Sequence, residues 1–511
     1  MTVDAVRLVA SIMPTSVDHG IAVARRARMR GADCIEYRLD RWSDPGTVST
    51  LLRGTPGPTI VACRVPSDGG VFEGDPDERR RLLQAAVVGG VTWIDLEHWE
   101  PYCPPPDADV RVLRSFHRFG TAPRDLMGIV DRMSASDPDA LKVVLRAYDA
   151  ADLDLLDALY ARGYEVPLVA FLAGEPGIAS RFLAVLRGAP FLYCHTAADA
   201  ATAPGQPDLF EALEIYRVRS MRQRVRFWGL AGSPVSHSLG TRLHNHVERH
   251  LAGAPTYLPF DSKDPERLLR VLTSFGNRFA GLSITAPLKQ HFVPLCDELS
   301  PAARACGAIN TLIHDSGRLR GENTDVVGIR AALCEALPRR GAFAGRRALV
   351  LGSGGSARAA VVALEDLGCE VALSVRSRQG IRAFAEEHEV SLYPVGPKVF
   401  EAFDPDVLVH ATPVGQGDGR GSRGDCLVDA RSLHASMVVL DLVYAPVRTP
   451  LFCHAVAAGA TAVSGLTMFL HQAREQLRLV LDERPPAIPA LHRLLGPLSH
   501  EPLVIRSSEH G

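Results

Sequence analysis

Residues 346–364, RRALVLGSGGSARAAVVAL, decide the fold of the second half of the chain. The apolar run 348–351 predicts a strand, and GSGGSA follows it directly and opens a helical pattern. Glycines at such a turn allow a tight bend and a close backbone approach to a pyrophosphate, which the amides and dipole of the helix N-terminus attract. The stretch therefore predicts a Rossmann-type dinucleotide-binding lobe, with contacts at Gly352, Ser353, Gly354, Gly355, Ser356 and Ala357.

The next predicted strand, EVALSV at 370–375, distinguishes between two dinucleotides. It is followed by Arg376, Ser377 and Arg378, where an NAD-binding protein places an acidic residue for the ribose hydroxyls. Guanidinium groups suit a 2′-phosphate because they form charge-assisted hydrogen bonds and stack on adenine. Two exposed arginines at a turn are the alternative interpretation. The pattern favours NADP as the cofactor.

The first half of the chain has a different pattern of predicted strands and helices. Short β-rich runs alternate with helix-like segments, which predicts an α/β fold with an N-terminal (β/α)8 TIM barrel whose chemistry lies at the C-terminal ends of the strands. The eight runs are 8–12, 34–37, 59–63, 91–96, 110–113, 141–145, 168–172 and 191–193.

Polar residues gather at the ends of these runs, and Lys142 is the most informative of them. A lysine inside an apolar barrel strand loses solvation, which lowers its pKa and produces a nucleophile suited to Schiff-base chemistry. A lone strand lysine more often packs its stem and extends its ammonium to water. Here His117, at the end of the preceding run, can act as acid and base, and Arg64 and Arg181 can hold a carboxylate and hydroxyls.

Six motifs of this half resemble the type I 3-dehydroquinate dehydratases in order and spacing, over about residues 6–220. They are EYRLD (36–40), ACRVPSDGG (62–70), SFHRF (115–119), DALKVV (139–144), GIASRF (177–182) and TAPGQ (202–206). The resemblance implies that Lys142 forms an imine with the substrate C3 ketone and that His117 removes a C2 proton before water leaves C1. It also implies a set of substrate-binding residues: Glu36, Arg38, Arg64, Arg181, Thr202 and Gln206.

Two positions depart from the family pattern. Arg118 stands after His117 where the family has an aspartate, and Asp68 replaces a glutamate found four residues after the first binding arginine. Asp68 is one methylene shorter, so we expect any hydrogen bond that it makes to His117 or substrate to be longer. The Gly- and Asp-rich segment 66–77 is a candidate lid.

Further motifs of the second half resemble shikimate dehydrogenase over about residues 227–480. They are GSPVSHSLGTRLHN (232–245), SITAPLK (283–289), GAINTL (307–312), GENTDVVG (321–328), DLVYAPVRTPL (441–451) and GLTMFLHQA (465–473). Hydroxyls, amides and a lysine meeting in one cleft can bind a small polyhydroxylated acid. The implied substrate residues are Ser236, Ser238, Thr285, Asn310, Tyr444 and Gln472, and Thr412 and Gly465 join the implied cofactor residues.

The resemblance makes Lys289 and Asp325 the catalytic pair: the lysine exchanges a proton with the C3 oxygen while NADPH delivers hydride, and the aspartate orients the lysine. A surface salt bridge is the alternative. Ser238 and Thr324 match enzymes that use shikimate rather than those that prefer quinate. His410 departs from an asparagine of the family, which places local cofactor contacts in question while the backbone course is expected to survive.

These patterns predict several domains. The barrel spans 1–222, a shikimate-binding lobe spans 227–335 and is completed by 464–492, and an NADP-binding lobe spans 340–463. The remainder, 493–511, belongs to a tail rich in Pro, His and Ser that we expect to be poorly ordered from about residue 485.

Composition limits the possible partners. Lys and Arg number 56 against 58 Asp and Glu in 511 residues, so no global field favours nucleic acid or a membrane surface. We expect small-molecule substrates as partners. The ten cysteines are scattered singly, without zinc spacing, and the start MTVDAVRLVASIMP lacks the features of a signal or transit segment, so we expect no metal and a cytoplasmic location.

The dehydratase product, 3-dehydroshikimate, is the ketone that a shikimate dehydrogenase reduces, so the fused order predicts two consecutive reactions of the shikimate pathway. Two alternatives remain at this stage. One is an aldolase-like Schiff-base barrel fused to a quinate dehydrogenase, since a barrel lysine alone does not distinguish dehydration from carbon–carbon cleavage. The other is a scaffold with one inactive half.

Overall fold

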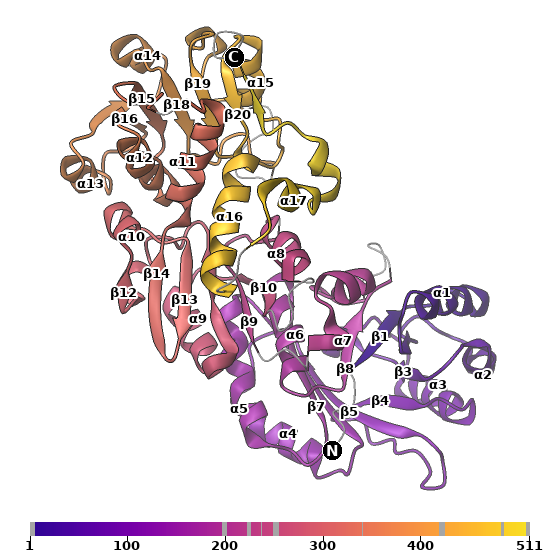
Figure 1. Cartoon of the computed structure of the whole chain (residues 1–511). Coiled ribbons are helices and arrows are strands. Elements are labelled where there is room, and N and C mark those ends of the chain that lie inside the picture. The colour runs from indigo at the N-terminus through magenta and orange to yellow at the C-terminus, as the bar shows by residue number, and fades with distance from the viewer. Residues whose placement is uncertain are drawn as a thin grey trace. The chain divides into compact units, whose positions relative to one another are not determined.

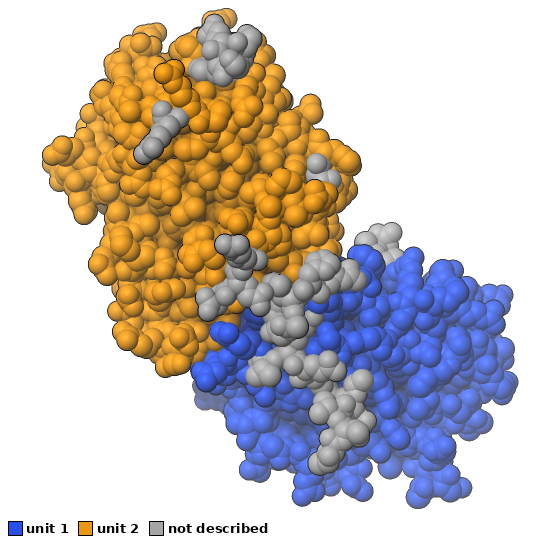
Figure 2. Space-filling view, in the orientation of Figure 1, with its two compact units in different colours: residues 1–227, 234–236, 255–278 blue, residues 228–233, 237–254, 279–511 orange. Residues whose placement is uncertain are grey.

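The computed structural model describes residues 6–196, 202–221, 226–236, 238–248, 255–339, 341–417, 425–481 and 485–506 (Figure 1). Contacts divide the chain into two compact units, shown in Figure 2. Unit 1 comprises residues 1–227, 234–236 and 255–278, and unit 2 comprises 228–233, 237–254 and 279–511. None of the helices in the described part of the chain has the length and hydropathy that a membrane span requires.

Unit 1 contains the predicted barrel, and all eight strands are confirmed. They pair in the order β7-β6-β5-β4-β3-β2-β1-β8, and every pairing in this sheet is parallel. The strands are β1 (Arg7–Ile12), β2 (Cys34–Arg38), β3 (Thr59–Ala62), β4 (Trp93–Glu97), β5 (Arg111–Arg118), β6 (Ala140–Arg146), β7 (Leu168–Ala173) and β8 (Phe191–Cys194). Burial on both faces explains why most of these runs are almost continuously apolar.

Helices follow most barrel strands, as the alternating pattern predicts. They are α1 (Val17–Met29), α2 (Pro45–Gly54), α3 (Pro76–Val88), α4 (Leu126–Ser134), α5 (Asp154–Arg162), α6 (Ile178–Leu186) and α7 (Val218–Met221); β10 (Thr256–Asp261) and α9 (Pro265–Thr273) are also grouped with this unit. The link 98–110 between β4 and β5 contains no helix. The prediction that a helix follows every one of the eight strands is therefore wrong for β4. Its prolines at 104–106 lack the amide hydrogens that a helix needs.

Unit 2 contains the predicted Rossmann-type sheet, in the order β17-β16-β15-β18-β19-β20-β21. Its strands are β15 (Arg347–Leu351), β16 (Glu370–Val375), β17 (Ser391–Pro394), β18 (Val407–His410), β19 (Val438–Asp441), β20 (Thr461–Val463) and β21 (Val504–Ile505). β16 and β17 lie on one side of β15, and β18 pairs with β15 on the other side. This reversal of strand order creates the switch point where such sheets bind ligands. The helices are α11 (Thr324–Ala336), α12 (Gly355–Asp366), α13 (Arg382–Glu387), α14 (Lys398–Phe403), α15 (Pro450–Ala457) and α16 (Gly465–Leu481).

A mixed set of strands precedes this sheet. β9 (Phe227–Gly232), β11 (Phe279–Ile284), β13 (Thr311–Asp315), β14 (Arg318–Glu322) and β12 (Glu298–Leu299) follow one another in that order. β13 is antiparallel to both of its neighbours. α8 (Gly240–Glu248) and α10 (Pro301–Cys306) complete this region, and α16 returns against α11.

The C-terminal segment is better ordered than predicted. α17 (Ile488–Arg493) packs on α16, and β21 pairs antiparallel with β20 through Ala462–Ile505 and Val463–Val504. The expectation of a poorly ordered tail is therefore wrong for residues 485–506. The composition did not reveal that two apolar residues, Val504 and Ile505, cover the edge of a sheet that would otherwise present unpaired backbone groups.

Candidate active sites

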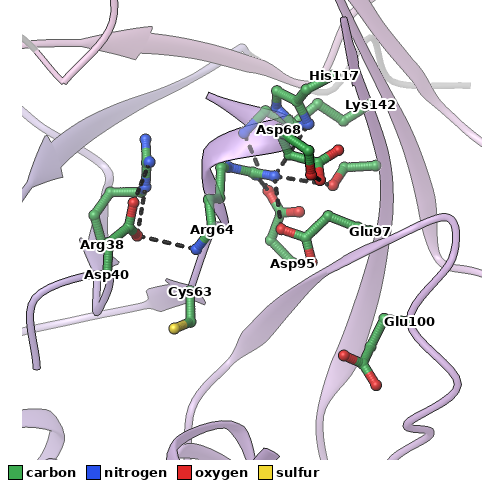
Figure 3. A network of polar contacts seen from close by, with 12 residues as sticks. Arg38, Asp40, Cys63, Arg64, Asp68, Asp95, Glu97, Glu100, His117 and Lys142 are labelled. Atoms are coloured by element: carbon green, nitrogen blue, oxygen red, sulfur yellow. Dashed lines mark hydrogen bonds and ion pairs between the residues drawn. The ribbon is translucent and has the colours of Figure 1, made fainter. Parts of the chain in front are cut away.

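The first candidate site surrounds Lys142 inside the barrel (Figure 3). Lys142 lies on β6 and is 4% exposed. Its Nζ donates to Asp95 Oδ2 at 3.1 Å and to Glu36 Oε1 at 3.4 Å, and it lies 3.8 Å from the centroid of the Tyr193 ring. The lysine is buried as predicted, and two carboxylates lie within hydrogen-bond distance of its ammonium.

His117 lies on β5, next to the lysine strand, and its pKa is held well below the usual histidine value. The cause is burial first, followed by the positive charges of Arg64 and Lys142. The ring is therefore neutral. Its Nδ1 lies 3.0 Å from Arg64 Nη1, and because a guanidinium can only donate, Nδ1 is the acceptor and the ring proton is on Nε2.

Arg64 follows β3 and is the hub of this network. Its guanidinium forms an ion pair with Asp95, lies 3.3 Å from Glu97 Oε1 and donates to Ser115 Oγ at 3.2 Å in addition to His117. Protein acceptors thus already surround the group that the sequence predicted to bind substrate. In Figure 3 the Arg64 side chain points from β3 between the carboxylates and the imidazole.

Arg181, on α6, differs from Arg64 because few protein groups bind its guanidinium. It is 2% exposed, its Nη2 donates to Pro204 O at 3.3 Å, and its Nε has no hydrogen-bond partner among the described residues. Burial lowers the pKa of Arg181 to about 10, and its guanidinium lies over the Phe171 ring at 4.2 Å. A buried cation without an anionic partner is costly unless a ligand supplies one, so Arg181 is the better candidate for a substrate carboxylate.

The remaining predicted residues are placed as follows. Glu36 accepts from Ser11 Oγ at 2.5 Å and from Lys142. Arg38 pairs with Asp40, whose Oδ1 also accepts from the Arg64 amide at 3.1 Å. Thr202 donates through its amide and hydroxyl to Gln206 Oε1, at 3.0 and 3.1 Å, so these two hold their own loop in shape.

The two departures from the family pattern also have partners. The Asp68 carboxylate accepts from Trp99 Nε1 at 3.1 Å and from Ser67 Oγ at 2.9 Å, so its shorter side chain is directed to Trp99. Arg118 donates to Thr121 O at 3.3 Å on the exposed rim. Asp95 and Ser115 are among the polar residues at the ends of the predicted runs, but no role was predicted for either of them; in the structure both bind the Arg64 guanidinium.

The second candidate site lies in unit 2 around Lys289. Its Nζ forms an ion pair with Asp325 and donates to Ser356 Oγ at 3.0 Å, so the predicted catalytic pair is assembled beside the glycine-rich loop. Asn310 Nδ2 donates to the other Asp325 oxygen at 2.7 Å and lies 3.3 Å from Gln472 Oε1. One network thus joins Asn310, which directly precedes β13, and residues of α11 and α16 to the lysine.

Other predicted substrate residues have local roles. Thr324 hydrogen bonds with Asn310 and donates to Gln472 Oε1 at 3.3 Å. Ser238 Oγ accepts from the Gly240 amide at the start of α8.

The other predicted substrate residues have packing contacts or no assigned contact. Thr285 packs closely against Gly232, because a side-chain Cβ at Gly232 would lie only 2.3 Å from the Thr285 Cγ2 atom. The Tyr444 ring lies 5.1 Å from that of Phe469. Ser236 belongs to unit 1 by contacts, and its role stays a prediction.

The glycine-rich loop borders a cavity of about 540 Å³. Gly352 has a φ of +128°, which a side chain rarely adopts, and a Cβ there would lie 2.8 Å from Ala411 O. A Cβ on Gly355 would lie 2.9 Å from the Lys289 Cβ, so glycine lets the lysine segment approach α12. Several predicted cofactor residues line the cavity: Gly352, Ser353, Gly354, Gly355, Ser356, Arg376, Ser377 and Thr412.

Three predicted cofactor residues do not line this cavity. Ala357 is buried in the core of the lobe, and Arg378 donates to Leu392 O on β17 at 3.2 Å. Gly465 lies at the start of α16, where a Cβ would be 2.6 Å from the Asp441 and Val443 carbonyl oxygens. Of the two arginines predicted to bind the 2′-phosphate, Arg376 and Arg378, Arg376 is therefore the better candidate.

His410, the departure in the NADP-binding lobe, has a complete set of partners. It ends β18 opposite Asp441 on β19, and its Nδ1 donates to the Asp441 carboxylate at 2.8 Å. Its Nε2 lies 2.5 Å from Thr412 Oγ, and Thr449 Oγ donates to the second Asp441 oxygen. His410 thus connects Thr412, which lines the cavity, to Asp441.

Two family models match the chain. The type I 3-dehydroquinase model covers residues 8–223, and the shikimate dehydrogenase substrate binding domain model covers residues 230–312. The chloroplastic bifunctional 3-dehydroquinate dehydratase/shikimate dehydrogenase of Arabidopsis thaliana is 28% identical over an alignment of 504 residues, and the match covers 92% of this chain and 81% of that protein.

Other relatives match the second half. The NADP+ shikimate dehydrogenase of Gluconobacter oxydans is 36% identical over 264 residues, covering 51% of this chain and 91% of that protein. A crystal structure of shikimate 5-dehydrogenase from Thermus thermophilus, in complex with NADP(H) and shikimate, is 32% identical and covers 53% of this chain and 99% of that one, with a TM-score of 0.47. The chain belongs to the shikimate dehydrogenase family through its second half and carries a type I 3-dehydroquinase domain in its first.

Proposed function

We propose that this chain catalyses two consecutive reactions of the shikimate pathway. The first half dehydrates 3-dehydroquinate to 3-dehydroshikimate through a Schiff base on Lys142, and the second half reduces 3-dehydroshikimate to shikimate with NADPH. The observation that carries the proposal is a pair of separate lysine-centred networks, Lys142 between carboxylates beside a neutral histidine, and Lys289 paired with Asp325 beside a dinucleotide loop.

For the dehydratase, Lys142 Nζ must lose a proton before it attacks the C3 ketone. Asp95, 3.1 Å away, and Glu36, 3.4 Å away, are placed to accept it. The imine draws electrons from C2, so His117 can remove a C2 proton. The C1–oxygen bond then breaks, and the leaving hydroxyl takes that proton from His117 and departs as water. Because Arg64 holds His117 Nδ1 in the free protein, this nitrogen becomes a base only when the guanidinium moves away.

The substrate carboxylate is assigned to Arg181. Its guanidinium is buried, lacks an anionic partner among the described residues, and lies over the Phe171 ring. Binding a carboxylate there would relieve the cost of burying the cation. Glu36, Arg38, Thr202 and Gln206 remain proposed contacts for substrate hydroxyls.

For the dehydrogenase, Lys289 donates a proton to the C3 oxygen as the ketone is reduced, and Asp325 keeps the ammonium oriented. Asn310 holds the second Asp325 oxygen at 2.7 Å, which fixes the carboxylate. NADPH, when bound, supplies hydride to the carbonyl carbon. The residues present fit this cofactor, since a Cβ on Gly354 would meet no atom within 4 Å and Arg376 lines the same cavity as the loop.

Two assays test the proposal separately. Formation of a conjugated enone from 3-dehydroquinate, without NADPH, reports the first reaction, and reduction of NADP+ by shikimate reports the second. Failure of either assay with folded protein contradicts the assignment of that half. Quinate in place of shikimate tests the substrate preference that Ser238 and Thr324 predict.

Replacing Arg376 with alanine is expected to raise the KM for NADPH about tenfold, because a charge-assisted hydrogen bond to a phosphate is worth about 1.5–3 kcal/mol and this exposed side chain realises the lower part of that range. The KM for NADH should stay the same, since NADH lacks the 2′-phosphate. Steady-state kinetics with both cofactors measure the change.

Two matched variants complete the Arg376 experiment. Arg378→Ala removes an arginine that is bonded to Leu392 O, and Arg382→Ala removes one that is paired with Glu386 on α13. Both should leave the NADPH preference close to that of the parent protein. A preference that survives Arg376→Ala but is lost in Arg378→Ala would move the phosphate site to Arg378.

We further infer three functional domains, at 1–222, 227–335 with 464–492, and 340–463.

A cytoplasmic location also stays a prediction. It is supported by the ten cysteines, all of which are free thiols, as expected in a reducing compartment.

A further inference from the structure

Tyr193 occupies an unusual position in the first candidate site. It lies on β8, is 3% exposed, and presents its ring to the Lys142 ammonium at 3.8 Å. Its hydroxyl has no hydrogen-bond partner among the described residues. A buried hydroxyl without a partner costs free energy, whereas phenylalanine would fill the same space without that cost.

Other barrel tyrosines show how such a hydroxyl is normally satisfied. Tyr160 Oη donates to Ala170 O at 2.7 Å and accepts from the Ala170 amide at 3.1 Å. Tyr37 Oη lies 2.7 Å from Thr55 Oγ. The unpaired hydroxyl of Tyr193 is therefore a property of its position at the reactive lysine and not of tyrosines in this barrel.

The charges around Tyr193 make it a hydrogen-bond donor. Burial first, and then the carboxylates of Glu36 and Asp95, raise the pKa of the phenol well above its usual value of 10, so the hydroxyl keeps its proton. The phenol donates to neither carboxylate: Glu36 binds Ser11 and Lys142, Asp95 Oδ2 binds Arg64 and Lys142, and Asp95 Oδ1 has no hydrogen-bond partner among the described residues. The phenol proton is thus available to a ligand oxygen that comes within reach of Lys142.

We propose that Tyr193 is a further catalytic residue of the dehydratase, which donates a hydrogen bond to the ketone oxygen as Lys142 attacks. This rests on the proposed Schiff-base reaction. The amine lone pair forms the carbon–nitrogen bond, and the carbonyl π pair moves onto oxygen, where the phenol stabilises the developing negative charge. No proton leaves Tyr193 in this step.

The test is Tyr193→Phe in the full chain, which removes one oxygen and retains the ring against Lys142. We expect kcat for dehydration to fall about 10- to 100-fold with a small change in KM, since a single donor at a developing oxyanion is typically worth about 10²–10³ and a phenol in this position acts on one step only. The rate of borohydride trapping with 3-dehydroquinate in a single turnover should fall in parallel. The thermal unfolding midpoint should stay level or rise, because an unsatisfied buried group is lost.

Tyr160→Phe is the matched control. It removes a hydroxyl with two backbone hydrogen bonds, so the thermal midpoint should fall while kcat stays the same. A Tyr193→Phe protein with unchanged kcat and trapping rate overturns the role of Tyr193, and so does one whose kcat falls together with its thermal midpoint. Absence of dehydration and trapping in the unsubstituted protein would instead overturn the proposed dehydratase, and this role with it.

Discussion

Lys142→Ala is expected to abolish dehydration of 3-dehydroquinate, with a loss of at least about 10⁴-fold in kcat, because no other group among the described residues around Glu36 and Asp95 can form the imine. Borohydride reduction in the presence of substrate should add no mass to the variant, whereas it should modify Lys142 in the parent protein. Enone absorbance and mass spectrometry of the intact chain measure both effects.

The design needs a variant that retains the charge at this position, since alanine leaves two buried carboxylates without their cation. Lys142→Arg supplies a cation between Glu36 and Asp95 but no amine that forms an imine, so it should be folded and equally inactive. Oxidation of shikimate by either variant should proceed at the parent rate, which serves as an internal measure of folding in unit 2. Trapping that persists in Lys142→Ala would show that a different amine carries the chemistry.

Lys289→Ala has the second largest expected effect. It removes the group that pairs with Asp325 and contacts Ser356, so kcat for shikimate oxidation should fall about 10²- to 10⁴-fold, the usual contribution of a positioned acid–base group. The KM for shikimate should change much less, because Asn310, Thr324 and Gln472 hold one another independently of the lysine. Steady-state kinetics at saturating NADP+ measure the two constants.

Asp325→Asn accompanies this variant. The amide keeps the shape of the side chain but removes the charge that orients the ammonium, so kcat should fall by less than in Lys289→Ala. Dehydration of 3-dehydroquinate should be unchanged in both proteins. A Lys289→Ala protein with the parent kcat would show that another group handles the proton.

Much of the fold follows from local sequence. The barrel strands could be predicted because parallel strands buried on both faces are short apolar runs at regular intervals. The Rossmann-type lobe could be predicted because GSGGSA follows an apolar run directly and opens a helical pattern. The missing helix after β4 and the paired tail strand β21 were not predicted. Both depend on details that periodicity does not show, a run of prolines and two residues that meet a sheet edge.

The sites could be predicted only in part. Motif residues such as Lys142, His117, Lys289 and Asp325 are brought into networks with the expected partners nearby. The sequence did not show that Arg64 is held by Asp95 and His117, because bonds between neighbouring strands depend on register and rotamer. Nor could it reveal that the Tyr193 hydroxyl lacks a partner, since satisfaction of a buried group is a property of the folded interior.

The central claim is that one chain performs both reactions, and incubation of the purified protein with 3-dehydroquinate and NADPH tests it most directly. Shikimate and NADP+ should form in equal amounts, and a borohydride-treated parallel sample should carry the substrate-derived mass on Lys142. Accumulation of enone without loss of NADPH would contradict the assignment of the second half. The absence of both enone and a trapped imine would contradict the assignment of the barrel.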